Sequence, residues 1–150
     1  MWRSARPEDD SHVIALCAAL YEEDPGSEPV PVSHHARTLE TLRRDPLRGV
    51  ALVLEEDGAV RGYAFLVAVW SNELGGEVVT IDELYVTPSH RRRGLSTALI
   101  RALGEPDGPW TGRPVALELE VTPDNARARA LYERLGFRIK RNSVLRKKLP

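Results

Sequence analysis

IDELYVTPSHRRRGLSTALIRAL, residues 81–103, joins an apolar strand to a helix through a turn rich in arginine. The strand stops at Pro88, and the helix opens at Gly94. The amides of a first helical turn have no partners within the helix, and the helix dipole places partial positive charge there. Glycine has no Cβ, so a ligand can approach its backbone closely. We therefore predict that this turn binds a pyrophosphate, with charge supplied by three arginines: Arg91, Arg92 and Arg93.

The spacing of the turn differs from two other nucleotide motifs. It lacks the GxGxxG pattern of dinucleotide-binding folds and the GxxxxGK(S/T) pattern of ATP and GTP sites. The alternative interpretation of the three arginines is a solvated charge run with no ligand.

Length and composition predict a single domain over residues 1–150. The 21 basic and 22 acidic residues give a net charge of −1, so no overall field favours nucleic acid or an anionic membrane. The single cysteine, Cys17, excludes an internal disulfide, and its apolar neighbours predict a buried thiol. Because the sequence shows no signal peptide and no apolar run of membrane-spanning length, we expect a cytoplasmic protein.

The pattern of apolar residues outside the turn predicts a mixed α/β sheet. Asp57-Gly58, between two apolar runs, predicts a tight β-hairpin. The unit of strand 78–86, helix 94–103 and strand 115–121 predicts a right-handed parallel crossover. The remaining predicted elements are a strand over 2–5, helices over about 9–21, 33–44 and 123–136, a loop over 22–32, and one or two closing strands within 137–149.

A second motif lies in the helix that follows residue 122. In DNARARALYERLGF, residues 124–137, Asn125 and Tyr132 lie seven residues apart and therefore on one helix face. The string N-x-x-A-x-x-L-Y-x-x-L-G-F resembles the second motif of the GNAT superfamily of N-acetyltransferases. The earlier turn resembles the acyl-CoA loop of that family, Arg/Gln-x-x-Gly-x-Gly/Ala, with Ser96 in place of the last small residue.

This resemblance implies a fold, a cofactor and a set of binding residues. The fold is α/β (mixed α+β), with a mixed, mostly antiparallel sheet, helices on both faces, and a splay between strands four and five. Acetyl-CoA is expected to lie in that splay. Its binding residues are expected to be Leu84, Tyr85 and Val86 through their main chain, Arg91, Arg92, Arg93, Gly94, Leu95, Ser96 and Thr97 around the pyrophosphate, and Asn125 at the pantetheine or thioester.

Acetyl transfer to an amine needs one group that removes a proton and one that supplies a proton. Tyr132 is expected to lie beside the sulfur and to act as the general acid. Two adjacent carboxylates in an apolar strand, Asp82 and Glu83, are the candidates for the base, with a slight preference for Glu83. A salt bridge to an arginine is the alternative role for these acids. Direct attack in a ternary complex is expected, because Cys17 is poorly placed as a nucleophile.

The acceptor is predicted from weaker features. The family builds its acceptor pocket near the loop 22–32 and the segment 70–77, where acids favour a small cationic amine. The candidate residues there are Tyr21, Glu22, Trp70 and Glu73. The alternatives are a protein or peptide N-acetyltransferase, a CoA-binding module without turnover, and nucleic-acid binding by the basic tail, which the neutral chain disfavours. A homodimer is possible, and no metal is expected.

Overall fold

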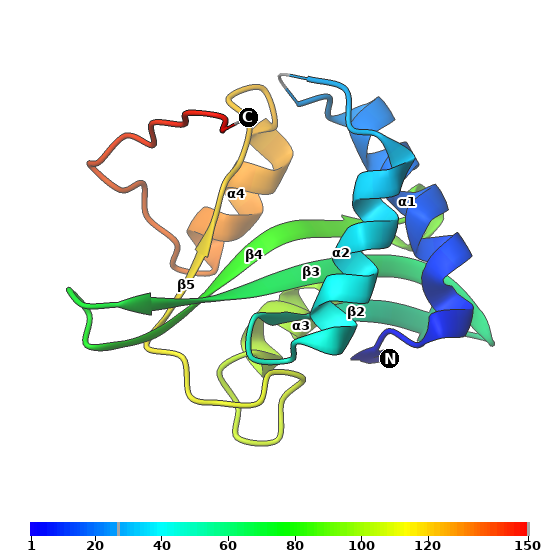
Figure 1. Cartoon of the computed structure of the whole chain (residues 1–150), viewed down its shortest axis with the longest axis horizontal. Helices are drawn as coiled ribbons and strands as arrows, with labels where there is room; N and C mark the ends of the chain where they lie inside the picture. The colour runs from blue at the N-terminus through cyan, green and yellow to red at the C-terminus, as the bar shows by residue number, and fades with distance from the viewer. Residues whose placement is uncertain (27, 150) are drawn as a thin grey trace. The chain divides into compact units, whose positions relative to one another are not determined.

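A computed structural model describes residues 1–26 and 28–149. The chain divides into two compact units, Met1–Glu120 and a smaller unit that begins at Val121. Figure 1 shows the elements of both units. They are β1 (Trp2–Ser4), η1 (Pro7–Asp9), α1 (Asp10–Glu23), α2 (Val32–Arg44), β2 (Gly49–Glu56), β3 (Ala59–Ser71), β4 (Gly76–Val86), η2 (Pro88–His90), α3 (Leu95–Ala102) and β5 (Ala116–Leu119) in the first unit, and α4 (Ala126–Arg134) in the second.

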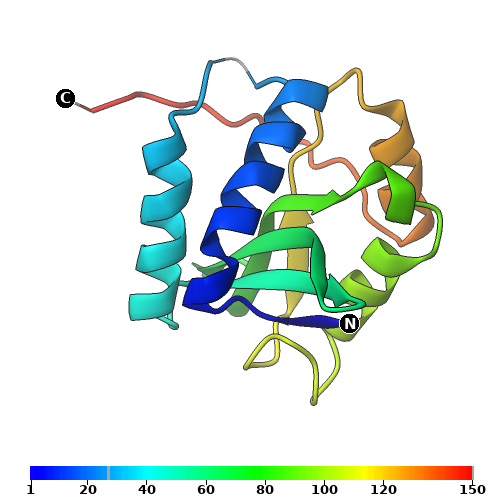
Figure 2. The same cartoon turned by 90° about the vertical axis from the view of Figure 1, so that its right-hand side faces the viewer.

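The first unit is built on a five-stranded sheet in the order β1-β2-β3-β4-β5. Strands β1 to β4 are antiparallel neighbours, and β5 runs parallel to β4. Helices α1 and α2 cover one face, and α3 lies on the other (Figure 2). This arrangement confirms the predicted fold class.

The core on the α1–α2 face follows from the alternation of side chains along each strand. Val13 and Cys17 of α1 pack with Leu39 and Leu42 of α2. They meet buried side chains of the three central strands: Ala51, Val53, Tyr63, Phe65 and Tyr85. The predicted burial of Cys17 is therefore confirmed.

The predicted hairpin at Asp57-Gly58 is also confirmed. Asp57 and Gly58 have φ angles of 52° and 72° and connect β2 to β3. Two successive positive φ angles match the right-handed twist of the flanking strands. The dipeptide therefore sets the pairing next to the turn, Glu56 with Ala59 and Glu55 with Val60, and the register shifts by one residue beyond Glu55.

Strand β4 contains a β-bulge that the sequence did not reveal. Leu66 of β3 pairs with Ile81, whereas Phe65 pairs with Glu83, so that Asp82 is the inserted residue. A bulge shifts the alternation of the strand by one residue. As a result Glu83 shares the α1 face with Tyr63 and Tyr85.

The parallel ladder between β4 and β5 is short. It runs from Val78↔Ala116 to Ile81↔Leu119. Beyond Ile81, β4 continues for five residues to Val86 without β5 beside it. This is the splay that the sequence predicted between the fourth and fifth strands.

Several predicted boundaries were wrong. Helix α1 extends to Glu23, so Glu22 and Glu23 are helical rather than part of a loop. Strand β5 is limited to Ala116–Leu119, because β4 is the neighbour it pairs with and that ladder ends at Leu119. Residues 137–149 form no strand, since their unit contains a helix and no sheet edge, and an isolated hairpin is marginal in water.

Asp9 ties β1 to the start of α1. Its buried carboxylate accepts hydrogen bonds from both terminal nitrogens of Arg3, at 2.7 and 3.0 Å, and from the Arg6 amide at 2.8 Å. These donors, above all Arg3, lower the pKa of Asp9. A lowered pKa stabilises the fold above the ordinary value of the carboxyl, and that stability is lost as the pH falls through the folded-state value.

We expect Asp9→Asn to lower the free energy of unfolding by about 2 kcal/mol near pH 7, because charged hydrogen bonds are lost. The deficit should shrink as the pH falls through the lowered folded-state pKa of Asp9, because the wild-type carboxyl then becomes protonated as well. Urea unfolding at pH 7, 4 and 2.5 measures both effects. Glu8→Gln is the control, since Glu8 is exposed and lies 4.0 Å from Arg6. A deficit that is equal at all three pH values would contradict the role of the charge.

Candidate active site

The turn between β4 and α3 has an unusual backbone. Arg92 and Gly94 have φ angles of 64° and 74°, and Gly94 is the N-cap of α3. The first helical hydrogen bond runs from the Ala98 amide to the Gly94 carbonyl. The amides of Leu95, Ser96 and Thr97 therefore precede the first hydrogen bond of the helix, and the N-cap residue, Gly94, has no side chain to accept from them. Trp2 holds the turn in place, because its indole donates to the Leu95 carbonyl at 3.0 Å.

Arg91 bridges three elements. Its Nε donates to the Val86 carbonyl at 2.7 Å, and Nη2 contacts both oxygens of Glu23 at 2.7 and 2.9 Å. The guanidinium also lies 5.1 Å from the centre of the Tyr85 ring. Arg91 thus holds the turn against β4 and the last turn of α1.

Arg93 is paired in a similar way. Both of its terminal nitrogens donate to Glu56 at the end of β2, at 2.6 and 2.7 Å, and this contact lowers the pKa of Glu56. Two of the three arginines therefore bind carboxylates of the protein itself. Arg92 is exposed at the turn, where its charge adds to that of the backbone amides.

The last residues of β4 line the splay. Ala64, Tyr63 and Gly62 of β3 pair with Leu84, Tyr85 and Val86 respectively. The opposite edge of these three residues lies beyond the end of the β4–β5 ladder. A strand edge of this kind presents backbone donors and acceptors to a ligand.

Glu83 is the centre of a hydrogen-bonded cluster on the α1 face. Its Oε1 accepts a hydrogen bond from the Tyr21 hydroxyl and its Oε2 accepts one from the Tyr63 hydroxyl, both at 2.6 Å. The Cys17 thiol lies 3.9 Å from Oε2. Burial raises the pKa of both phenols, and it raises the pKa of Cys17 to about 12. The phenols and the thiol therefore stay protonated around the carboxylate.

The two adjacent carboxylates lie in different surroundings. Glu83 is half-buried and held by hydroxyl groups, whereas Asp82 is exposed on the bulge. A carboxylate that is partly shielded from water and fixed in orientation is better suited to proton transfer. The partners of Glu83 in this cluster are phenols and a thiol rather than an arginine.

Tyr132 and Asn125 belong to the second unit. Asn125 is the N-cap of α4, where its Oδ1 accepts a hydrogen bond from the Ala128 amide at 3.1 Å. Tyr132 is half-buried, and burial raises the pKa of its phenol. Its ring meets Phe137 edge-on, with centroids 5.7 Å apart. Tyr132 is therefore a protonated phenol held on a helix.

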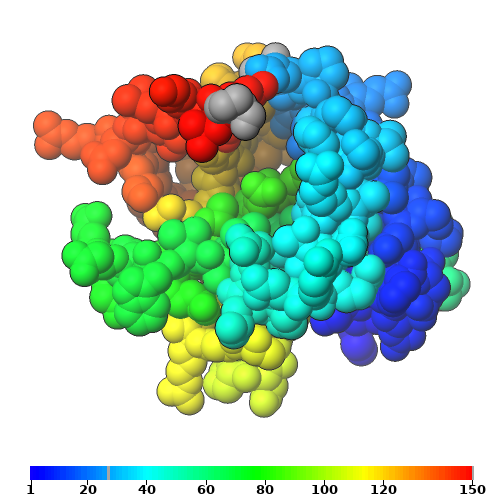
Figure 3. All heavy atoms as spheres, viewed as in Figure 1, coloured from blue at the N-terminus to red at the C-terminus, as the bar shows by residue number. Residues whose placement is uncertain are grey.

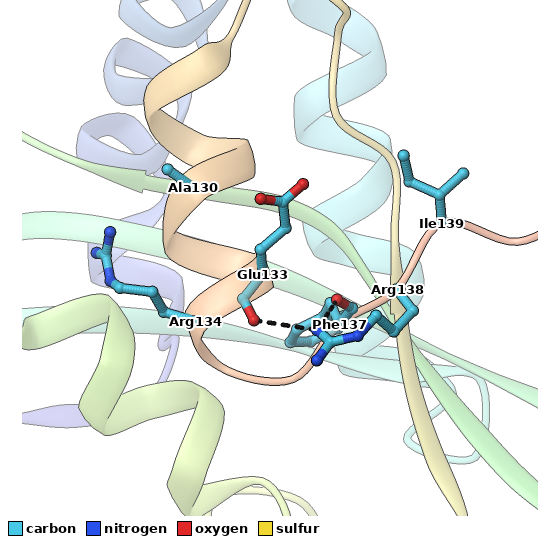
Figure 4. Close-up of a pocket in the computed structure, with 6 residues that line it drawn as sticks. All are labelled: Ala130, Glu133, Arg134, Phe137, Arg138 and Ile139. Atoms are coloured by element: carbon cyan, nitrogen blue, oxygen red, sulfur yellow. Dashed lines mark hydrogen bonds between the residues drawn. The ribbon is translucent and has the colours of Figure 1, made fainter.

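A hollow of about 660 Å³ lies at the end of α4 (Figure 4). Its lining residues are Ala130, Glu133, Arg134, Phe137, Arg138 and Ile139. Arg138 donates to the carbonyls of Glu133 and Phe137, at 3.2 and 2.9 Å. None of the candidate site residues lines this hollow.

The predicted acceptor residues fall into two groups. Tyr21 and the exposed Glu22 lie on the last turn of α1, close to Glu83. Trp70 is 74% exposed and pairs with Glu77, and Glu73 lies in the turn that follows. Figure 3 shows this turn, in green at the left, away from α1 in blue at the right.

The separation of the two groups follows from the length of β4. Glu77 and Glu83 are six residues apart on this strand, which corresponds to about 20 Å. The structure therefore brings Tyr21 to the Glu83 cluster, with the exposed Glu22 next to it in the last turn of α1, and leaves Trp70 and Glu73 at the other end of the strand.

Two residues near the site were not identified from the sequence. Tyr63 was assigned only to a central apolar strand, and Glu23 only to an acidic loop. The sequence did contain a signal for Tyr63: a tyrosine in a buried strand needs a hydrogen-bond partner for its hydroxyl group. Glu23 also accepts a hydrogen bond from the Tyr85 hydroxyl at 2.7 Å.

The described residues contain neither a membrane-spanning helix nor a cluster of metal ligands. No helix in that part of the chain is long and apolar enough to cross a membrane. Within the same residues, no three histidine, cysteine or acidic side chains are grouped so that they could hold a metal ion.

Comparison with known proteins adds independent evidence. The sequence profile of the acetyltransferase (GNAT) family matches residues 15–137. A mycothiol acetyltransferase from Parafrankia sp. (strain EAN1pec) is 40% identical over 100 residues, 65% of this chain and 27% of that protein. The match therefore spans about a quarter of that relative's length. A thialysine N-epsilon-acetyltransferase from Bos taurus is 26% identical over 153 residues, 91% of this chain and 82% of that protein.

A solved structure shares the fold. The crystal structure of an acetyltransferase from Clostridium acetobutylicum with acetyl-CoA superposes with a TM-score of 0.78. It is 15% identical, and the superposition covers 98% of this chain and 95% of that one. At this level of identity the likeness concerns the fold alone.

Proposed function

Because the chain belongs to the GNAT family of acetyltransferases, we propose that it transfers an acetyl group from acetyl-CoA to a primary amine. The main support is the turn that opens α3. The amides of Leu95, Ser96 and Thr97 precede the first hydrogen bond of the helix. Apart from Gly94, its chain neighbours and the adjacent helix backbone, no atom of the described residues lies within 4 Å of where a Cβ on Gly94 would stand. This open, uncapped helix start has the donors and the space that a pyrophosphate requires.

The proposed cofactor contacts use backbone more than side chains. The pyrophosphate would bind the amides of the α3 turn, assisted by the exposed Arg92. The edge of β4 at Leu84, Tyr85 and Val86 would bind the pantetheine arm, and Asn125 would bind near the thioester. Arg91 and Arg93 would hold the turn in shape through Glu23 and Glu56.

The chemistry requires that the amine first loses a proton. An amine with a pKa of about 10.4 is less than about one part in a thousand neutral at pH 7. We assign Glu83 as the base, acting directly or through water, since it is half-buried and oriented by Tyr21 and Tyr63. The neutral amine then attacks the carbonyl carbon of the thioester, so that a C–N bond forms and the C–S bond breaks.

The departing thiolate takes up a proton, and we assign Tyr132 as its source. The proton that the attacking nitrogen releases as the amide forms then restores the Tyr132 phenol through solvent. Burial keeps this phenol protonated, as a general acid must be. Direct transfer is favoured over an acetylated enzyme, because Cys17 is fully buried and its pKa of about 12 leaves the thiol protonated. Acetyl-CoA supplies the activated acetyl group when bound.

A small cationic amine is the proposed acceptor. Glu22 and Asp82 are exposed acids near the cluster, and the charge of Glu23 is offset by Arg91. The bovine relative, named for acetylation of the ε-amine of thialysine, supports an acceptor of this size. A thiol-release assay with acetyl-CoA against polyamines, aminoglycosides, amino acids and peptides tests the proposal. Turnover with peptides alone would favour a protein acceptor, and no release with any amine would contradict acetyl transfer to amines.

We expect Gly94→Val to weaken CoA binding about tenfold. A β-branched residue resists a φ of 74°, and its side chain would occupy the space in front of the first-turn amides. Isothermal titration calorimetry with CoA measures the loss. Gly75→Val is the matched control, because Gly75 has a φ of 66° in equally open space within the β3–β4 turn. Equal affinity of the two variants would show that the Gly94 turn is not the phosphate site.

A further inference from the structure

The two oxygens of the Glu83 carboxylate have different surroundings. Oε2 accepts its hydrogen bond from Tyr63, which lies on β3 and is fully buried, and Cys17 on the same side is fully buried as well. Oε1 accepts its hydrogen bond from Tyr21, which is half-buried on the last turn of α1. One oxygen therefore faces the core, and the other faces the end of a helix.

The two phenols are also held differently. Tyr63 lies in the middle of the sheet, between paired strands, and its ring packs on Phe65 and Tyr85 with centroid distances of 5.1 and 6.4 Å. Tyr21 has one aromatic neighbour, His35 of α2, at 5.7 Å. Three residues after Tyr21 the helix has ended and the segment toward α2 begins. Tyr63 is thus fixed by packing, whereas Tyr21 can move with the end of its helix.

Other titratable groups surround this cluster from each neighbouring element. They are Cys17, Tyr21 and Glu23 on α1, His35 on α2, Tyr63 on β3, Asp82 and Tyr85 on β4, and Arg91 beyond Tyr85. Glu23 and Arg91 pair with each other.

We propose that Tyr63 is a positioning residue for Glu83, and that Tyr21 is the partner that gives way when the acceptor amine binds. Tyr63 keeps Oε2 on the core side, so that Oε1 is the oxygen that meets the amine. This inference rests on the proposed function, since it assigns Glu83 as the base.

The reason is that another hydrogen-bond donor can replace Tyr21 at the Glu83 carboxylate, whereas none can replace Tyr63. A carboxylate that is partly removed from water needs hydrogen-bond donors for its charge, and a phenol that stays protonated is a permanent donor. An ammonium group at Oε1 would replace the Tyr21 hydroxyl by a stronger, charged donor. Tyr63 cannot be replaced in this way, because no open path leads to a fully buried hydroxyl.

The test is a pair of single variants combined with Glu83→Gln. We expect Tyr63→Phe to lower kcat about tenfold while the KM for acetyl-CoA changes less than twofold. In the Glu83→Gln background the same substitution should change kcat less than twofold, because its effect acts through the carboxylate. Tyr21→Phe should alter mainly the KM of the acceptor amine.

Tyr85→Phe is the matched control. It removes another buried phenol from the same aromatic group, but that phenol donates to Glu23 rather than to Glu83. Its effect on kcat, whatever its size, should be the same with and without Glu83→Gln. If the effect of Tyr63→Phe on kcat were the same with and without Glu83→Gln, as is expected for Tyr85→Phe, the positioning role would be overturned.

A second measurement does not depend on the folding of the Tyr63 variant. In the wild-type protein labelled with ¹³C at tyrosine Cζ, the hydroxyl proton of Tyr63 should give a slowly exchanging, downfield NMR signal. This signal should shift or disappear in Glu83→Gln. A Tyr63 hydroxyl that exchanges rapidly and ignores Glu83→Gln would overturn the inference. Absence of acetyl transfer by the wild-type protein would instead refute the proposed function on which the inference rests.

Discussion

Glu83→Gln is expected to lower kcat/KM for the acceptor amine about 100-fold near pH 7. Glutamine has nearly the same shape and its single amide oxygen still accepts a hydrogen bond from one of the two phenols, but it cannot take a proton from the ammonium form of the amine. General base catalysis contributes on the order of 10²-fold or more. Thiol release measured over a range of amine concentrations gives the ratio, and calorimetry with CoA should show unchanged cofactor binding.

The deficit should depend on pH in a defined direction. As the pH rises toward the pKa of the amine, the neutral fraction increases and a base is needed less. The ratio of wild-type to variant rates should therefore fall with rising pH. Asp82→Asn provides the comparison between the two carboxylates, and its loss should be much smaller. A larger loss from Asp82→Asn than from Glu83→Gln would assign the base to the bulge residue instead.

Tyr132→Phe is expected to lower kcat at least tenfold, and toward 100-fold, without a change in the KM for acetyl-CoA. The variant lacks the proton that the departing thiolate would take up, and a thiolate is a poorer leaving group than a thiol whose pKa is near 8.5. The edge-on contact with Phe137 involves the ring and remains. Steady-state kinetics together with the thermal unfolding midpoint measure the effect. Unchanged turnover in a folded variant would remove Tyr132 from the role of acid.

Local chemistry explains what the sequence predicted well. Asp57-Gly58 prefers positive φ angles at two successive positions, so the hairpin follows from the dipeptide itself. The helix predicted over 33–44 is present, and Leu39 and Leu42, three residues apart at helical spacing, are both buried. The two motifs indicated the family because each joins a recognisable residue pattern to a predicted element.

Contacts that join distant residues could not be predicted. Glu83 lies 62 residues from Tyr21 and 20 from Tyr63, so no local pattern reports their hydrogen bonds. The bulge at Asp82 depends on pairing with β3, and the alternation of residues alone would place Ile81 on the same face as Glu83, whereas the bulge puts them on opposite faces. The arginine pairs with Glu23 and Glu56 likewise depend on the tertiary fold.

The prediction of closing strands failed for a related reason. One or two closing strands were predicted within residues 137–149, yet the apolar side chains of Ile139, Val144 and Leu145 are 75–94% exposed. Strand formation requires a neighbouring edge as well as suitable residues. The unit that begins at Val121 provides no such edge within itself.

The early end of the β4–β5 ladder has an evolutionary consequence. Every residue except proline carries the same peptide donor and acceptor, so few substitutions would delete a contact of the kind proposed for Leu84 and Val86, which uses the main chain. The side chains at such a site can be substituted while the site continues to bind the same cosubstrate. Selection can then vary the end of α1 to suit new acceptors, and enzymes with little sequence in common can share a single acyl donor.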